Sequence, residues 1–296
     1  HLSIRRQRQM CIRDSPLDLF GPPGITDRVE HLLHGFDWNL CEPTWFTLRV
    51  HEVHESVIRE SHFSGPDCFL RQDGGEVPRA GLTIWSSPFV SVSAEILDHK
   101  LPVLAFRIDE RPPFTVNREK LVAVGLQAGD WLRDLKKTAW RGEVGDAVAP
   151  LCRDGTPAPP LSPSEAAALC VALQRDEEGV SIGYLTDIGW TADNLARVER
   201  LFAGVTLLCS ECAFLAGDEE KARASHHLCT GDLNRLARTL KPPYLLPMHL
   251  SKSYLRRTGD LYRELAPPPG TTVLSLPKHI VPPPLGEADV KGWLTP

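Results

Sequence analysis

The stretch Ser181-Ile182-Gly183-Tyr184-Leu185-Thr186-Asp187 is an apolar segment that ends on an aspartate. Thr191 follows shortly after it, and threonine is a preferred residue at the N-cap of a helix. Apolar residues then recur at helical spacing, at Leu195, Val198, Leu201 and Phe202. The stretch therefore predicts a strand that ends on Asp187, followed by a helix packed on the sheet.

The alternation of strand and helix continues on both sides of this stretch. In the second half, strands are expected at 180–187, 205–211 and 244–250, and helices from Thr191 and over 230–240. In the first half, a strand, a turn and a helix are expected over 17–36, followed by strands at 45–53, 90–96 and 101–108. This order predicts an α/β fold.

Composition sets limits on the class of protein. The chain has 296 residues, of which 42% are hydrophobic and 24% charged, and its net charge is −5. Those values are typical of a soluble globular protein, and no apolar run approaches the roughly 20 residues that span a bilayer. The eight cysteines are scattered and do not indicate a disulfide framework, which favours a reduced, cytoplasmic setting. The net charge argues against a uniformly basic surface that coats nucleic acid.

Three segments are expected to lie outside regular packing. Residues 1–15 are Arg-rich, lack an apolar secretory core, and resemble translated adaptor sequence, so we expect a non-native leader before Pro16. Residues 150–163 contain five prolines and predict a loop or connector. Residues 266–296 predict a Pro-rich C-terminal extension that wraps around a main domain of residues 16–265.

Candidate site residues gather at the ends of the predicted strands. Asp187, Glu211 and His249 each close an apolar strand, and His99 follows another. In open α/β sheets ligands bind beyond the carboxyl ends of the strands, where side chains from several strands converge. A carboxylate can bridge two cations and imidazoles can complete each coordination shell, a donor set that suits zinc. Each residue alone is weak evidence, but their joint placement predicts a metal centre.

Several motifs together resemble ribonuclease Z, the tRNA 3′-end-processing endonuclease of the metallo-β-lactamase superfamily. The resemblance runs from Leu17 to about Arg257. The matching segments are Leu19-Phe20-Gly21-Pro22-Pro23-Gly24, Ala94-Glu95-Ile96-Leu97-Asp98-His99, residues 125–136, Tyr184-Leu185-Thr186-Asp187, Glu211-Cys212-Ala213-Phe214, His227-Leu228-Cys229 and Pro247-Met248-His249-Leu250-Ser251. Their order and spacing follow the family, which implies a four-layer αββα sandwich.

The resemblance assigns roles to five residues. It implies His99 as a ligand of one zinc ion, Asp187 as the bridge between two, and His249 as a ligand of the second. It implies that His227 acts beside the scissile phosphate, with Glu211 orienting its ring. Cys229 stands where the family usually has threonine, so the local hydrogen bonding beside His227 is expected to differ.

One family motif is missing from the sequence. The H-x-H-x-D-H pattern that supplies the remaining zinc ligands occurs nowhere in the 296 residues, and the segment that should follow it begins at Leu17. The resemblance therefore implies a sandwich that lacks its first strands, with an incomplete second zinc site. We expect the chain to be an inactive fragment truncated upstream of Pro16; evolutionary loss of the motif is the alternative.

The segment between Arg111 and Arg141 is locally basic. It contains seven basic and three acidic residues, a net charge of +4 within an acidic chain. The resemblance assigns it to a substrate arm, with Arg133, Lys136 and Lys137 as candidate contacts to precursor tRNA phosphates. From charge alone, an amphipathic helix with a solvated basic face is equally consistent. The family further implies a homodimer.

Other patterns and other functions stay open at this point. His51-Glu52-Val53-His54-Glu55 resembles a zinc-protease motif, but its histidines are three residues apart on a predicted strand, which argues against metal binding. The pair Cys209 and Cys212 favours buried small residues over a redox motif, and His226 is expected to face solvent. Besides removal of the 3′ trailer of precursor tRNA, the candidate functions are hydrolysis of small phosphodiesters or esters and non-catalytic RNA binding as a scaffold.

Overall fold

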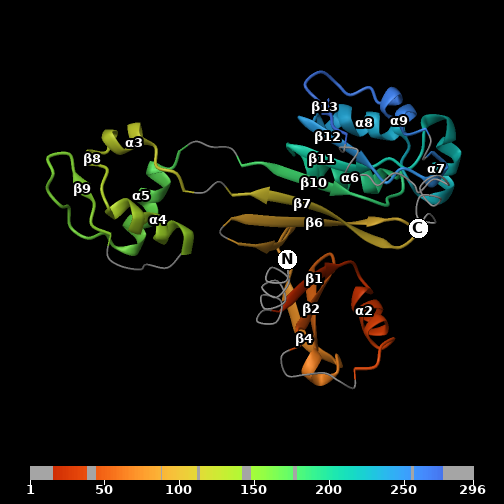
Figure 1. The fold of residues 1–296 in the computed structure, drawn as a ribbon, viewed down its shortest axis with the longest axis horizontal. Coiled ribbons are helices and arrows are strands. Elements are labelled where there is room, and N and C mark those ends of the chain that lie inside the picture. Colours follow the sequence, from red (N-terminus) through yellow and green to blue (C-terminus); the bar gives the residue numbers. More distant parts are fainter. Residues whose placement is uncertain are drawn as a thin grey trace, which may run out of the picture. The chain divides into compact units, whose positions relative to one another are not determined.

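The computed structural model describes residues 16–38, 45–87, 89–111, 114–141, 148–175, 179–254 and 257–275 (Figure 1). The chain divides into two compact units. The first contains residues 1–84, 92–107 and 182–296, and the second contains residues 85–91 and 108–181. The expected leader, residues 1–15, lies outside the described residues.

A four-stranded sheet opens the first unit. Its order follows the chain: β1 (Leu17–Gly21), β2 (Thr47–Val53), β3 (Val57–Ser64) and β4 (Arg71–Pro78). β1 runs parallel to β2, and the other neighbours are antiparallel. The helix α2 (Ile25–Leu33) begins after Gly24, whose φ of 86° lies in the left-handed region that glycine adopts at low cost.

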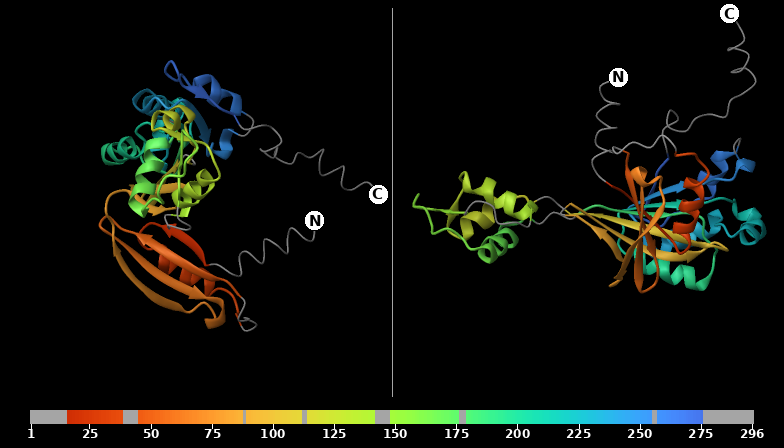
Figure 2. Two further views of the ribbon diagram at one scale, coloured as in Figure 1. Left: turned by 90° about the vertical axis from the view of Figure 1, so that its left-hand side faces the viewer. Right: turned by 90° about the horizontal axis from the view of Figure 1, so that it is seen from below.

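One face of this sheet is packed against α2, as Figures 1 and 2 show. Alternate residues of a strand point to the same face. Leu48 and Val50 of β2 and Phe63 of β3 therefore share one face, where they form an apolar cluster with Val29 of α2 and with Phe69. Phe69 follows the short 3-10 turn η1 (Gly65–Asp67) that leads from β3 toward β4.

A seven-stranded sheet holds the predicted strand ends. Its order is β13-β12-β11-β10-β7-β6-β5. The strands are β5 (Thr83–Ser86), β6 (Val90–Asp98), β7 (Pro102–Glu110), β10 (Ser181–Leu185), β11 (Leu207–Glu211), β12 (Tyr244–Met248) and β13 (Thr272–Val273). The neighbours from β10 to β13 are parallel. Their carboxyl ends therefore lie at one edge of the sheet.

Helices cover one face of the parallel strands. They are α6 (Ala192–Phe202), α7 (Glu219–Ser225), α8 (Thr230–Leu240) and α9 (Thr258–Glu264), with short 3-10 turns η2 (Ala216–Asp218) and η3 (Lys252–Tyr254). Phe202 of α6 and Leu233 of α8 join Leu185, Leu208 and Leu245 of the strands in one core. Among the described residues, no helix combines the length and apolar character that a membrane span needs.

The second unit combines helices with a small sheet. It contains α3 (Arg118–Ala123), α4 (Trp131–Arg141) and α5 (Pro163–Leu173), with a small sheet of β8 (Leu126–Gln127) and β9 (Leu151–Cys152). Its own apolar cluster includes Leu121, Trp131, Leu135 and Leu173. Ser162 and Glu165 form a capping box that begins α5. The expected arm, residues 111–141, lies inside this unit, which continues to Ser181.

Two expectations about irregular segments need correction. The Pro-rich segment 150–163 carries the short strand β9, since the backbone of Leu126 and Gln127 pairs with Cys152 and Leu151. In the predicted C-terminal extension, Thr272 and Val273 form β13 and pair with β12, so this part adds a strand to the sheet instead of wrapping around it. Periodicity does not reveal strands of two residues, which depend on an available neighbouring edge. Residues 276–296 lie outside the described ones.

Candidate active site

Three neighbouring parallel strands bring Asp187, Glu211 and His249 together. Ser210 pairs with Leu185 on one side and with Pro247 on the other, so the three strands end in register. Glu211 is the last residue of β11, while Asp187 and His249 lie just beyond β10 and β12. The predicted convergence at the strand ends is therefore present in the structure.

The backbone bends sharply at two of these residues. Asp187 has φ of 50° and His249 has φ of 60°, both in the left-handed region that non-glycine residues seldom adopt. Such conformations persist where the surrounding structure over-determines them, and they concentrate at functional sites. The turns direct both side chains to one point, where His249 Nδ1 lies 2.6 Å from Asp187 Oδ1.

His227 reaches the same point from the connection between α7 and α8. Its backbone N–H donates to the carbonyl of Ala222, and the carbonyl of the next residue, Leu228, accepts from Phe214 N. His227 Nδ1 lies 3.9 Å from Asp187 Oδ1. Asp187, His227 and His249 each offer one ligand atom within 4.8 Å of the others. These three residues are called the ligand group below.

The ligand group fits a divalent metal ion. One carboxylate and two imidazoles supply oxygen and nitrogen donors, the set that zinc accepts in hydrolases. No other group of three or more such residues occurs in the described part of the chain. His51 and His54 have separate carboxylate partners, at 2.8 Å for Asp18 and 2.9 Å for Glu52.

Glu211 is a fully buried carboxylate behind His227. Its oxygens accept from His227 Nδ1 at 2.9 Å, from Leu228 N at 3.2 Å and from Ile188 N at 2.6 Å. Burial raises the pKa of Glu211 from 4.5 to about 7, although the two backbone N–H groups act to lower it. Burial lowers the pKa of His227, and the Asp187 carboxylate opposes that shift. The Glu211 carboxylate fixes the orientation of the His227 ring, with Nε2 on the side away from Glu211.

His99 lies beside the ligand group without belonging to it. The ring centroids of His99 and His227 are 4.7 Å apart. His99 Nδ1 lies 2.6 Å from the carbonyl oxygen of His226, and because a carbonyl only accepts, Nδ1 is the donor. His99 Nε2 is therefore the ring nitrogen that keeps a lone pair for a ligand.

His226, which was predicted to face solvent, is partly exposed and more exposed than His227. Its side chain is 30% exposed, and its Nδ1 is buried with no hydrogen-bond partner among the described residues. His226 ends α7 in a left-handed conformation with φ of 58°. That bend turns its carbonyl toward His99 and presents His227 to the site.

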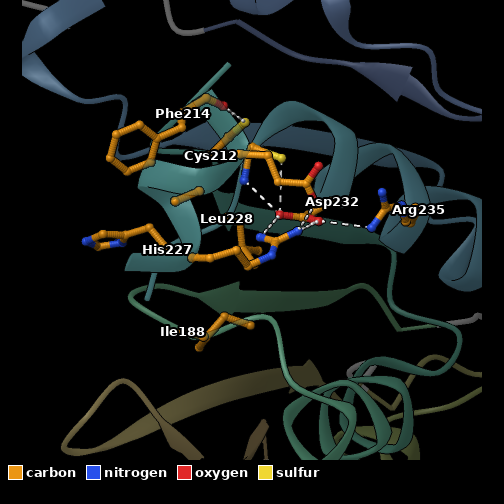
Figure 3. Close-up of polar contacts among 12 residues, drawn as sticks. Ile188, Cys212, Phe214, His227, Leu228, Asp232 and Arg235 are labelled. Carbon is orange, nitrogen blue, oxygen red and sulfur yellow. Dashed lines mark hydrogen bonds and ion pairs between the residues drawn. The ribbon is translucent and has the colours of Figure 1, made fainter. Parts of the chain in front are cut away.

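Cys229 begins α8 with a buried carboxylate as its partner (Figure 3). Asp232 accepts from Cys229 N at 3.0 Å and from its Sγ at 3.2 Å, which forms a capping box. Asp232 also accepts from Arg223 through both oxygens at 2.7 Å, and from Arg235 at 3.4 Å. At the position where the family usually has threonine, the Cys229 thiol and backbone N–H thus both donate to Asp232. Both arginines also lie over the ring of Trp190.

Sequence relatives identify the family. The ribonuclease Z of Deinococcus radiodurans is 32% identical over 248 residues, which cover 83% of this chain and 69% of the relative. This chain belongs to the ribonuclease Z family. The ribonuclease Z of Methanothermobacter thermautotrophicus is 26% identical over 247 residues, which cover 82% of this chain and 62% of that relative. No protein-family model matches the chain.

Family membership confirms the predicted α/β fold of metallo-β-lactamase type and the hydrolase class. The match spans 61% to 69% of the length of the first three ribonuclease Z relatives. Human tRNase Z, short form, superposes with a TM-score of 0.38 at 12% identity, over 82% of this chain and 63% of that one. Membership rests on the sequence relatives alone.

The candidate substrate contacts of this ribonuclease Z family chain lie on α4 of the second unit. Arg133, Lys136 and Lys137 are all exposed. Lys137 Nζ forms an ion pair with Asp134 at 2.9 Å, and Arg133 Nε lies 3.9 Å from the same carboxylate. Leu135, in the same turn of helix, is fully buried. The helix is therefore amphipathic, with these three basic side chains on its exposed surface.

Sequence reasoning missed two buried polar residues that support the site. Asn194 of α6 and Asp232 of α8 are both at most 1% exposed. Asn194 follows the Thr191 N-cap, where a polar residue usually interacts with solvent or with its own helix. For Asp232, the N3 position of a capping box was a usable signal, although the N-cap residue is a cysteine. The partners of Asp232 are within nine residues of it, whereas Asn194 contacts Asp98, which is 96 residues away.

Proposed function

We propose that this site is the metal-dependent phosphodiesterase centre of an endoribonuclease that removes 3′ trailers from precursor tRNA. The observation that carries the proposal is the convergence of Asp187, Glu211 and His249 at the ends of three parallel strands, with His227 in contact with Glu211 and Asp187. Asp187, His249 and His99 are the proposed metal ligands. His227 and Glu211 are the proposed catalytic pair.

Zinc is the proposed ion. When bound, a zinc centre lowers the pKa of bound water toward neutrality and acts as a Lewis acid on phosphate oxygens. The protein's own contribution is the placement of proton-transfer groups. His227 can hold a proton and deliver it to a leaving oxygen, and the Glu211 carboxylate orients the ring and increases its basicity.

Two roles are consistent with the position of His227. It has the carboxylate contact of an oriented acid–base residue, and it also lies in the ligand group. Titration with Co²⁺ as a spectroscopic probe of His227→Ala and His249→Ala separates the roles. If His227 is a proton donor, His227→Ala should lower Co²⁺ affinity by less than about tenfold. Because His249 is a proposed ligand, His249→Ala should lower Co²⁺ affinity by more than the roughly 10- to 100-fold typical of outer-shell partners.

The proposed substrate contacts are Arg133, Lys136 and Lys137 on α4. Lysine and arginine side chains that neutralise RNA phosphates release counterions, so RNA binding through these side chains weakens as the salt concentration rises. Precursor tRNA competed against mature tRNA and a cyclic nucleotide tests the substrate class. Preferential binding of both tRNA species supports the proposal, whereas preference for the cyclic nucleotide would support a hydrolase of small phosphodiesters.

The 296-residue chain itself is expected to bind metal weakly and to cleave no precursor tRNA. The sequence lacks the H-x-H-x-D-H motif, so one of the two metal sites would keep only His99 and the bridging Asp187. Zinc stoichiometry and cleavage of a 3′-extended precursor tRNA test this expectation together. Two tightly bound zinc ions per chain, or efficient cleavage, would contradict it. RNA binding without any metal binding would instead favour the non-catalytic scaffold.

The setting of the enzyme is also part of the proposal. We propose a cytoplasmic homodimer. The six described cysteines are all free thiols, in agreement with a reducing compartment: Cys68, Cys152, Cys170, Cys209, Cys212 and Cys229. Sedimentation of the purified chain would test the dimer.

A further inference from the structure

Asn194 is a buried polar side chain that connects two loops of the site. It lies in the first turn of α6 and is 1% exposed. Its Oδ1 accepts from Asp98 N at 2.9 Å, and its Nδ2 donates to Asp98 O at 2.9 Å and to Gly189 O at 2.8 Å. An asparagine amide has two donor hydrogens and one acceptor oxygen, so every group of this side chain is used.

These contacts act directly beside two of the proposed ligands. Asp98 ends β6 and precedes His99, and Gly189 lies two residues beyond Asp187. Gly189 N also donates to Asp98 O at 2.9 Å, so the two loops are in direct contact. A Cβ at Gly189 would lie 3.1 Å from His226 Nδ1, which is tighter than ordinary packing. Glycine at this position permits the close approach.

The ring of His99 is then oriented from the other side. Its Nδ1–H donates to the carbonyl of His226, while its own backbone N–H donates to Leu101 O. Asn194 therefore fixes where the His99 backbone lies relative to Asp187, and His226 fixes how the ring is turned. Together these contacts set the position of the His99 backbone and the orientation of its ring beside His227.

We propose that Asn194 is a positioning residue that holds His99 at the spacing from Asp187 required for both to serve one metal centre. The inference rests on the proposed function, because it uses the ligand role of His99. The chemistry requires an amide. Aspartate would direct its carboxylate at two carbonyl oxygens, and an apolar side chain would leave a backbone N–H and a carbonyl without this partner.

The test is a Co²⁺ titration of the 296-residue chain, followed by visible absorption. Asn194→Ala and His99→Ala are each expected to lower Co²⁺ affinity by about 10- to 100-fold. The double variant is expected to bind no more weakly than His99→Ala, because Asn194 acts through His99. A further loss of about tenfold in the double variant, as for independent sites, would overturn the proposal.

Asn234→Ala is the matched control. Asn234 lies on α8, where its side chain donates to Glu264 O at 2.9 Å and accepts from Ala266 N at 2.7 Å, so it joins two segments as Asn194 does. Its side-chain hydrogen bonds do not reach the ligand group. We expect Asn234→Ala to lower the stability about as much as Asn194→Ala and to leave Co²⁺ affinity unchanged. That result would show that the loss of affinity in Asn194→Ala does not come from a general loss of stability. Equal loss of affinity in both variants would overturn the proposal.

A metal-free measurement distinguishes failure of this inference from failure of the proposed function. Nitrogen NMR of the histidine side chains reports whether His99 carries its proton on Nδ1. We expect the tautomer protonated on Nδ1 in the wild type. The same tautomer should be present at reduced population in Asn194→Asp and absent in Asn194→Ala. If the wild type binds no Co²⁺, the proposed metal centre is wrong, while the His99 tautomer still decides the role of Asn194. An unchanged tautomer in Asn194→Ala would overturn that role.

Discussion

The site has two halves that are built in different ways. The strand-end half consists of Asp187, Glu211 and His249, which are placed by the register of three parallel strands. The loop half consists of His99 and His227, which lie in connections and depend on side-chain and carbonyl contacts from other segments. Main-chain pairing therefore fixes the first half, whereas individual polar residues fix the second.

The difference has a physical cause. A parallel ladder gives each strand end many hydrogen bonds and a buried apolar face, so no single side chain determines where Asp187 lies. In the loop half, Asn194 and Asp232 each make several hydrogen bonds to backbone or charged groups. In the strand-end half, only substitution of the site residues themselves should therefore impair metal binding. In the loop half, substitution of supporting residues should also impair the site.

The largest expected effect is in the strand-end half. Asp187→Asn keeps the shape of the side chain and removes the carboxylate that contacts His249. We expect Co²⁺ affinity to fall by more than about 100-fold, beyond the range for outer-shell partners, with little change in thermal stability. Asp193→Asn, an exposed carboxylate on α6, is the control and should bind Co²⁺ as the wild type does.

The second prediction concerns Asp232, which supports the loop half. Asp232 is fully buried and contacts Arg223 through both oxygens, so Asp232→Ala leaves this partly buried arginine with only its contact to the exposed Glu219 carboxylate. We expect the free energy of unfolding to fall by about 3 kcal/mol, measured by urea denaturation. Arg235→Ala removes only the longer, half-exposed contact to the same carboxylate and should cost under about 1 kcal/mol. Equal losses in the two variants would contradict the assigned role of Asp232.

The strand-end half could be predicted from the sequence, and the loop half only in part. Apolar runs that end on Asp187, Glu211 and His249 imply convergence, because the ends of neighbouring parallel strands share an edge. His99 is predicted by its place after an apolar strand, whereas His227 is implied only by the resemblance to the family. The contact of the His226 carbonyl with His99 and the contacts of Asn194 with Asp98 join residues that are distant in sequence, for which a single chain carries no local signal.

A third prediction concerns Glu211, which connects the two halves through His227. Burial raises its pKa from 4.5 in an unfolded chain to about 7, so the folded state binds the proton more tightly. The stabilisation is complete below pH 4.5 and is lost as pH rises to about 7. Glu211→Gln stays uncharged, so the metal-free wild type should lose about 3 kcal/mol relative to this variant across that window. Urea denaturation at several pH values measures the difference.

The control for this pH series is Glu199→Gln, which alters an exposed carboxylate on α6. Its stability should follow that of the wild type at each pH. A difference between Glu211→Gln and the wild type that is constant from pH 4.5 to 7 would mean that Glu211 does not titrate in this window. Bound metal should reduce the pH dependence, because a cation near His227 favours the Glu211 carboxylate.

The smallest expected effect lies outside both halves, on α4. Lys136→Ala combined with Lys137→Ala should weaken binding of precursor tRNA by about tenfold at moderate salt, and should lower the slope of log affinity against log salt by about 2. The matched control combines Arg238→Ala with Lys241→Ala, two exposed basic residues on α8 and at its C-cap. Because both pairs change the net charge equally, a loss confined to α4 would show that position, and not total charge, determines RNA binding. Equal losses would indicate nonspecific attraction.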